Sequence, residues 1–291
     1  MSPAALAATE LRSLVSLLDD EDPGNLDAIQ KRILEVGAPA IPLLEELREN
    51  SDPDLASRAD ALSRRLRFYS LRQEFREMAA APDPDLEQGV WLIARFGHPG
   101  LDYAAYHARL DEMAQQVRKE LPPGSGPEPA MQRLNHLLFS VLGFHGNEKR
   151  YYDPDNSYLN RVIDNRLGIP VSLSVLYLLL ARRLDLPALG VAVPGHFLVG
   201  LRLGRGVCYL DAYNGGKLMN LSEVQKTVEC GGRVFRPEHM AAAGTRDILI
   251  RMLRNLIPIY REQSQPDRAE MLSSLVDILR QGGAVRAATT R

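Results

Sequence analysis

The segment 170–184, PVSLSVLYLLLARRL, constrains the fold of this 291-residue chain more than any other. Its apolar residues point to every side of a helix; they are Val171, Leu173, Val175, Leu176, Leu178, Leu179 and Leu180. A helix that is apolar all round is buried in a core. Pro170 suits the first helical position, where its missing N–H costs no intrahelical bond. The run VLYLLLA is far shorter than the ~20 apolar residues needed to span a bilayer. The sequence therefore predicts a soluble core helix enclosed by other elements.

Helical patterns precede this segment. Apolar residues recur at three- and four-residue steps in 11–20, 26–37 and 40–50. The segment 36–68 is typical of a HEAT-type helix pair, although one such unit alone does not make a solenoid. The further elements expected before the core helix are helices within 86–121 and 131–144, a loop at 121–130 and a polar loop at 145–159.

The pattern changes after the core helix. Residues 189–219 carry β-branched runs punctuated by glycine, which predicts two or three strands in hairpin order. A short helix is expected at 221–230, and a helix pair at 245–263 and 266–281, with a frayed tail over 282–291. Helices, then a small antiparallel sheet, then helices again indicate a helix-rich α+β fold.

Composition limits the classes of function. The net charge of −2 and the pI near 6.3 do not favour nucleic acid or an anionic membrane as the main partner. Two cysteines, Cys208 and Cys230, are too few for a disulfide framework and favour a reducing compartment. Glu10 and Arg12 interrupt the apolar N-terminus, which makes a poor signal peptide. We expect a cytoplasmic protein.

One pair of residues has the spacing of a catalytic or binding site. His196 follows a Pro-Gly turn at a strand start, and Asp211 lies near the end of the next strand. Neighbouring antiparallel strands place cross-strand side chains about 5 Å apart. An aspartate in that place orients an imidazole and stabilises its charged form, and the nearby helix start offers unpaired N–H groups to an anion. Helix start, His, Asp is a chain order suited to acyl transfer.

The run 144–201 resembles the SirB-type family of the transglutaminase-like superfamily. The motifs that carry the resemblance are GN…YYDPDNSYL, R-x-GIP-x-SLS-x-LY and PGHFL, in that order. The resemblance implies a central helix packed on an antiparallel sheet, with Cys at the helix start and His and Asp on successive strands. His196 and Asp211 match the His and Asp positions. Aligning the family's Leu-Gly-Ile-Pro-like element on 184–187 and counting back places Pro170 where a nucleophilic Cys would stand.

The resemblance also suggests a division of the chain. We expect a HEAT-like helical region at 1–80, a SirB-type transglutaminase-like core at 81–240, and a truncated TPR-like helix pair with a tail at 241–291.

Two serines follow Pro170 in the chain, Ser172 two residues later and Ser174 four residues later. Residues two apart on a helix point about 200° from each other, so Ser172 and Ser174 cannot both face His196. Ser172, and less favourably Ser174, is a candidate nucleophile, while capping and close packing account for both serines without catalysis. Cys208 lies at an odd offset from Asp211 and therefore points to the other face of its strand. Nothing in the sequence places Cys230 near His196.

Other residues are candidates for lining a cleft. The loop 145–159 is expected to cap the core helix or to line a pocket over His196. The candidate lining residues are Pro170, Ser174, Asn147, Tyr152, Asn156 and Gly195. Asp153 and Asp155 lack the glycine and glutamate of a calcium loop, so we expect no metal and no cofactor. The arginines of RMLRNLIPIYR, at three-residue steps, are expected to form a solvated helix face.

These observations leave two functions open. The first is a non-catalytic scaffold that binds a peptide or protein through the His196/Asp211 cleft, because the thiolate that supplies the family's nucleophile is missing. The second is a hydrolase or acyltransferase in which Ser172 attacks an amide or ester, His196 acts as base and Asp211 orients it.

Overall fold

The computed structural model describes residues 3–204 and 206–289, and their side chains over 10–204 and 206–282. It is helix-rich with two small sheets, which confirms the predicted α+β class. The chain divides into two compact units, Met1–Glu74 and Phe75–Arg291. The expected three-part organisation, with boundaries at 80 and 240, stays a prediction.

The first unit is a small helical assembly. Its elements are α1 (Pro3–Ser16), η1 (Leu17–Asp19), α2 (Pro23–Val36), η2 (Ala38–Ala40), α3 (Ile41–Asn50) and the greater part of α4 (Pro53–Ala80). The side chain of Asp22 caps α2 by accepting from the Gly24 and Asn25 amides. A single apolar cluster closes the unit around Leu18, Ile33 and Leu44. Helices α3 and α4 occupy the predicted pair, although α4 runs well beyond the expected end at 68.

The second unit holds the core helix and most of the other elements. Its helices are α5 (Leu86–Gly97), α6 (Tyr103–Lys119), α7 (Pro127–Asn135), η3 (His136–Val141), η4 (Pro154–Asn156), α8 (Leu159–Asn165), α9 (Pro170–Arg183), α10 (Leu221–Cys230), η5 (Pro237–Met240), α11 (Thr245–Glu262) and α12 (Pro266–Thr289). Its strands are β1 (His145–Gly146), β2 (Leu167–Gly168), β3 (Ala188–Val191), β4 (Leu198–Leu203), β5 (Gly206–Asp211) and β6 (Lys217–Met219).

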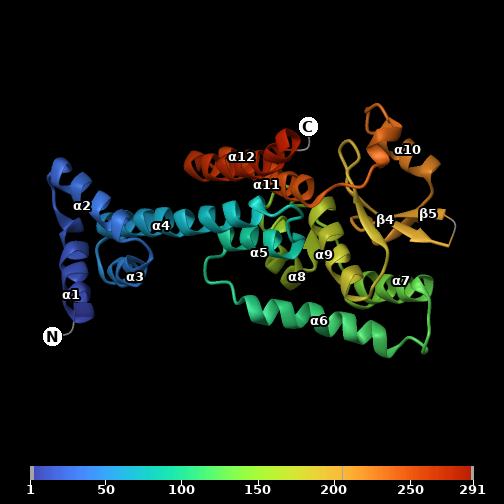
Figure 1. Ribbon diagram of the computed structural model, residues 1–291, viewed down its shortest axis with the longest axis horizontal. Helices are drawn as coiled ribbons and strands as arrows, with labels where there is room; N and C mark the ends of the chain where they lie inside the picture. Colours follow the sequence, from blue (N-terminus) through green and yellow to red (C-terminus); the bar gives the residue numbers. More distant parts are fainter. Residues whose placement is uncertain (1–2, 205, 290–291) are drawn as a thin grey trace. The chain divides into compact units, whose positions relative to one another are not determined.

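The main sheet has four antiparallel strands in the order β3-β4-β5-β6 (Figure 1). Its register pairs Gly190 with Val199, Leu201 with Cys208, and Leu210 with Leu218. Helix α9 packs against β3 and β4, whereas α10 contacts β5 and β6 through an apolar cluster that includes Val224 and Val228. The sheet is therefore covered by helices, and the meander carries His196 and Asp211 to one end of it.

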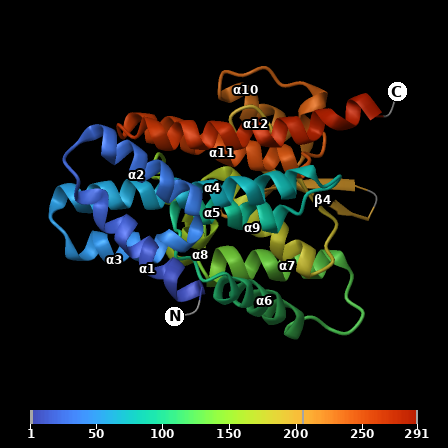
Figure 2. The same ribbon diagram turned by 60° about the vertical axis from the view of Figure 1, so that its left-hand side comes forward.

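Helix α9 is the centre of the second unit. Every residue from Pro170 to Ala181 is buried, as its all-round apolar pattern predicts. It contacts α6, α8, α11, β3 and β4. Helices α11 and α12 form an antiparallel pair along one side of this unit (Figure 2). Among the described residues, no helix is both long and apolar enough to cross a bilayer.

Four local predictions differ from the structure. The expected loop at 121–130 ends early because α7 begins at Pro127, a residue suited to a helix start. The expected helix 131–144 widens into the π-helical turn η3. The polar loop 145–159 contains β1 and η4, and β1 pairs in parallel with β2. The tail expected to fray from 282 continues as α12 to Thr289, and 290–291 lie outside the described residues.

Candidate functional site

The first turn of α9 is tied to the preceding loop by one buried hydroxyl. Ser172 Oγ donates to the Asn156 carbonyl at 2.6 Å, with the Ile169 carbonyl a longer second acceptor at 3.1 Å. The same oxygen accepts from the Ile169 amide at 3.1 Å. Ser172 is fully buried. Its hydrogen-bonding capacity is thus used by backbone groups, which is the behaviour of a capping serine.

Ser174 points in a different direction. Its Oγ donates to the carbonyl of Phe197, the residue after His196, at 3.3 Å. It lies one turn after Pro170 and is fully buried. The face of α9 that carries Pro170 and Ser174 is therefore turned toward the His196 segment, while Ser172 is turned toward Asn156. This agrees with the 200° separation expected for residues two apart.

Asn156 organises the loop that the sequence places over the site. Its side-chain amide donates to the carbonyls of Arg150 and Tyr151 at 2.6 and 3.1 Å, and its Oδ1 accepts from Asn147 at 2.9 Å. Asn156 is 3% exposed. Both asparagines, expected as lining residues, use these side-chain groups for hydrogen bonds within the loop. They support the site by fixing the backbone of Tyr151.

His196 and Asp211 are brought together as the strand pattern predicts. His196 lies two residues before β4, and Asp211 is the last residue of β5. His196 Nε2 lies 2.9 Å from Asp211 Oδ2, an ion-pair contact whose angle departs from a well-aligned hydrogen bond. The side chains are 15% and 3% exposed respectively. The contact at Nε2 leaves Nδ1 as the ring nitrogen that Asp211 does not engage.

Asp211 is held from a second side by the turn that follows it. Asn214 donates to it twice, from the backbone at 3.2 Å and from the side chain at 2.7 Å. Burial raises the pKa of the Asp211 carboxyl, but His196 and Asn214 outweigh burial and leave that pKa below its ordinary value. The carboxylate is therefore a fixed negative charge beneath the imidazole.

Aromatic rings cover the imidazole. The ring of Tyr213 meets that of His196 edge-on with centroids 6.1 Å apart, and Tyr151 meets Tyr213 at 6.2 Å. Tyr152, the expected lining residue, is 67% exposed and contacts this group only through Tyr151. Gly146 allows the Tyr213 ring to lie directly on β1, because a Cβ there would overlap the ring. Tyr151, which is not among the expected lining residues, is the tyrosine of this loop that contacts Tyr213, and the lining role of Tyr152 stays a prediction.

Gly195 belongs to the same surface. It adopts φ of 80°, a left-handed conformation that favours glycine, and a Cβ at this position would overlap the Arg233 guanidinium. No pattern in the sequence points to Arg233 as part of this surface. The same holds for Arg251 on α11, whose Nη2 lies 3.4 Å from the His196 carbonyl. Arg251 is half-buried, so the expectation that its helix face is solvated is wrong for this residue.

The two cysteines are unpaired. Cys208 lies on β5, three residues from Asp211, and burial raises the pKa of its thiol, which is the reverse of activation. Cys230 is exposed at the end of α10. Within the described part of the chain, no group of three or more His, Cys, Asp or Glu side chains could hold a metal ion.

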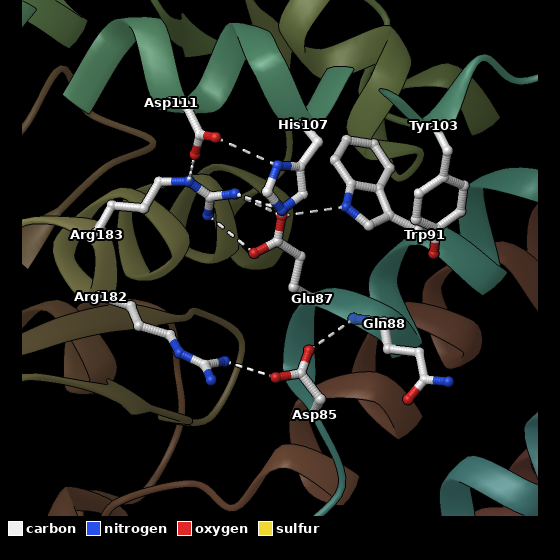
Figure 3. Close-up of a pocket in the computed structure, with 9 residues that line it drawn as sticks. All are labelled: Asp85, Glu87, Gln88, Trp91, Tyr103, His107, Asp111, Arg182 and Arg183. Carbon is white, nitrogen blue, oxygen red and sulfur yellow. Dashed lines mark hydrogen bonds and ion pairs between the residues drawn. The ribbon is translucent and has the colours of Figure 1, made fainter. Parts of the chain in front are cut away.

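A separate pocket of about 570 Å³ opens between α5, α6 and the end of α9 (Figure 3). Arg183 lies at its centre and is 12% exposed. Its two terminal guanidinium nitrogens donate hydrogen bonds to the Glu87 carboxylate at 2.7 and 2.8 Å, and its Nε donates to Asp111 at 2.6 Å. His107 and the Trp91 indole N–H also lie beside Glu87. Each carboxylate that lines this pocket is paired with Arg182 or Arg183, so we interpret the cluster as an ion-pair brace that joins three helices.

The brace generates a stability prediction. Lysine at position 183 keeps the charge but loses the planar fork, so Arg183→Lys is expected to lower the free energy of unfolding by about 1–2 kcal/mol. Arg182→Lys is the matched control, because Arg182 is 65% exposed and makes a single contact with Asp85. Its effect is expected to stay below about 0.5 kcal/mol. Urea unfolding monitored by Trp91 fluorescence measures both. Equal effects of the two substitutions would show that Arg183 is no brace.

Asp211 generates a pH prediction. The pKa of an aspartate in the unfolded chain is about 3.9, and the pKa of Asp211 in the folded protein lies below its ordinary value. The stabilisation is therefore present above the unfolded pKa and is lost as the pH falls through the folded pKa. The gap in unfolding free energy between the wild type and Asp211→Asn is expected to shrink on acidification from about pH 6 to about pH 3. Asp185→Asn, at a 93% exposed side chain, is the control without such a change. A difference in unfolding free energy between the wild type and Asp211→Asn that stays constant with pH would contradict the lowered pKa of Asp211.

Comparison with known proteins assigns the family. Residues 104–254 match the transglutaminase-like superfamily. A UPF0162 protein of Xylella fastidiosa (strain 9a5c) is 40% identical over 184 residues, which cover 61% of this chain and 66% of that protein. F-box only protein 21 of Homo sapiens is 29% identical over 191 residues, covering 62% of this chain and 28% of that protein.

The matches differ in extent. A UPF0162 protein of Vibrio cholerae is 27% identical over 132 residues, 45% of this chain and 49% of that protein. This chain thus spans slightly less than two thirds of the Xylella relative, and less of the others. No solved structure matches. Because the matched residues 104–254 make up more than half of its 291 residues, the chain belongs to the transglutaminase-like superfamily.

Proposed function

We propose that this protein is a non-catalytic member of its superfamily that binds a peptide or protein segment. The binding surface consists of His196, Asp211, Tyr151 and Tyr213 at the end of the sheet. Rings beside a partly exposed polar group suit peptide recognition, because they offer apolar area together with hydrogen-bond donors and acceptors. Neither nucleic acid nor a membrane is part of the proposal, given the net charge of −2.

One observation carries the proposal. The face of α9 turned toward the His196 segment carries Pro170 and, one turn later, Ser174, whose hydroxyl is fully buried and donates to the Phe197 carbonyl. Proline has no nucleophilic group, and Ser174 is shielded from a substrate. Among the described side chains, this face of α9 offers the imidazole no accessible hydroxyl or thiol to activate, which supports the proposal.

The alternative is a hydrolase or acyltransferase with a Ser172–His196–Asp211 arrangement. It requires the Ser172 hydroxyl to lie within hydrogen-bond reach of the imidazole and accessible to an ester or amide. Ser172 instead donates to the Asn156 carbonyl from a fully buried position. That geometry weighs against the alternative, and we assign Ser172 a capping role.

The finer family interpretation belongs to the same proposal. We interpret the chain as a SirB-type member with a HEAT-like region at 1–80 and a truncated TPR-like pair at 241–291. The two unpaired cysteines favour a reducing compartment such as the cytoplasm. The human F-box only protein 21 contains a similar segment within a much longer chain, which supports the use of this core as a module.

The proposal is tested by peptide selection on the intact protein. Random dodecapeptides displayed on phage are selected on the wild type, and the enriched peptides are measured by fluorescence anisotropy. Peptides that bind the wild type are expected to lose about tenfold or more in affinity with His196→Ala, because a hot-spot contact contributes more than about 1 kcal/mol. His136→Ala, at an exposed histidine on η3, is the control and is expected to bind as the wild type does. Selected peptides that bind His196→Ala unchanged would contradict the proposal.

A further inference from the structure

Two arginines, Arg233 and Arg251, lie beside the turn that contains Gly195 and His196. Arg251 extends from α11 and approaches the His196 carbonyl at 3.4 Å through Nη2. Arg233 follows α10, where its amide donates to the Val228 carbonyl at 3.2 Å. Its guanidinium lies over Gly195, at the turn that precedes His196. Both cations therefore border the surface assigned to the peptide.

Neither arginine has a carboxylate partner. Over the described side chains, 10–204 and 206–282, no Asp or Glu oxygen lies within 4.0 Å of a nitrogen of Arg233 or Arg251. Other arginines of the same unit are paired; Arg109 contacts Asp164, Arg161 contacts Asp155, and Arg183 contacts Glu87. Arg251 is half-buried and has therefore lost hydration without a compensating negative charge, whereas Arg233 is exposed and can reach an anion from solvent.

The two cations also act on each other. Burial, and then the positive charges of Arg233 and Arg254, hold the pKa of Arg251 below its ordinary value, and Tyr151 opposes them. Burial raises the pKa of the Tyr151 phenol, and the charges of Arg251 and Arg233 oppose that rise. Tyr151 therefore lies in the field of both guanidinium groups. An anion between them would relieve this repulsion, and the nearby ring of Tyr151 would limit its screening by water.

We propose that Arg233 and Arg251 form a carboxylate-binding site that takes an acidic side chain or the C-terminal carboxylate of the bound peptide. Guanidinium groups present planar forks of N–H donors that match a carboxylate in two parallel hydrogen bonds. The inference rests on the proposed peptide-binding function and adds a charge requirement to it. His196 and Tyr213 border the apolar part of the surface, and the two arginines supply its positive end.

The test compares three unlabelled hexapeptides of Gly and Ser, each acetylated at its N-terminus, by isothermal titration calorimetry on the full chain. One ends in an amide, one ends in a free carboxylate, and one carries two central Asp residues and ends in an amide. We expect at least one carboxylate peptide to bind about tenfold tighter than the neutral peptide, the gain typical of a charge-assisted pair. The two carboxylate peptides separate a C-terminal carboxylate from an acidic side chain.

Matched variants assign the preference to the two arginines. Arg251→Gln and Arg233→Gln are each expected to abolish the preference for carboxylate peptides. Arg261→Gln, at an exposed arginine ten residues further along α11, is expected to keep it. Arg251→Lys keeps the positive charge but loses the planar fork of N–H donors. It replaces Arg251→Gln as the test variant if Arg251→Gln fails to fold. Equal binding of all three peptides to the wild type, or a preference that survives in both variants, would overturn the inference.

A second readout separates a free-anion site from a peptide site. Inorganic phosphate and acetate are titrated into protein labelled with 15N-arginine, and the Nε–Hε signals of Arg233 and Arg251 are followed. Saturable shifts at both arginines, larger than at Arg261, are expected together with the peptide preference. Shifts with phosphate but no preference for carboxylate peptides overturn the inference in favour of a free-phosphate site.

The outcomes distinguish this inference from the function on which it rests. Peptide binding that requires His196 but ignores peptide charge keeps the proposed function and overturns the carboxylate site. A charge preference that requires both arginines but not His196 supports the carboxylate site and overturns the assignment of the peptide surface to His196.

Discussion

The hydrogen bond from Ser172 to the Asn156 carbonyl joins the two parts of the structure on which the site depends. One part is the buried helix α9, whose position is fixed by apolar contacts on all sides. The other is the loop that carries Tyr151, held by the side-chain amide of Asn156. Because Ser172 is fully buried, its hydroxyl needs a partner, and the carbonyl supplies it. The polar loop is thereby docked on an apolar helix.

This constraint is consistent with the proposal that the superfamily's layout is kept here without a nucleophile. The meander of β4 and β5 positions His196 against Asp211, and this pairing depends on the sheet register and not on the residue at the start of α9. Pro170 begins the helix, and its neighbours serve packing and capping. The proposed binding surface combines the imidazole, the rings of Tyr151 and Tyr213, and the two arginines. We infer that binding replaced acyl transfer on the same framework.

The sequence predicts the features that depend on local patterns. The all-round apolar pattern of 170–184 predicts the buried helix, and the strand–turn–strand spacing predicts that His196 and Asp211 meet. It also predicts that Ser172 and Ser174 point apart. Contacts between distant segments have no such signal. Arg251 reaches His196 across 55 residues, and an amphipathic helix pattern cannot show which of its arginines is half-buried. Tyr151 and Tyr152 are equivalent in the sequence, and it is Tyr151, whose carbonyl accepts from the Asn156 side chain, that contacts Tyr213.

The central claim is that neither serine of α9 is a nucleophile. The most direct test is labelling of the full chain with a fluorophosphonate, followed by peptide mass spectrometry of the segment that contains Ser172 and Ser174. A serine hydrolase treated in parallel shows that the reagent is active. The account predicts no modification of either serine in the wild type, because both hydroxyls are buried and bonded to carbonyls. Modification of Ser172 that disappears in His196→Ala would contradict it and would establish a serine enzyme.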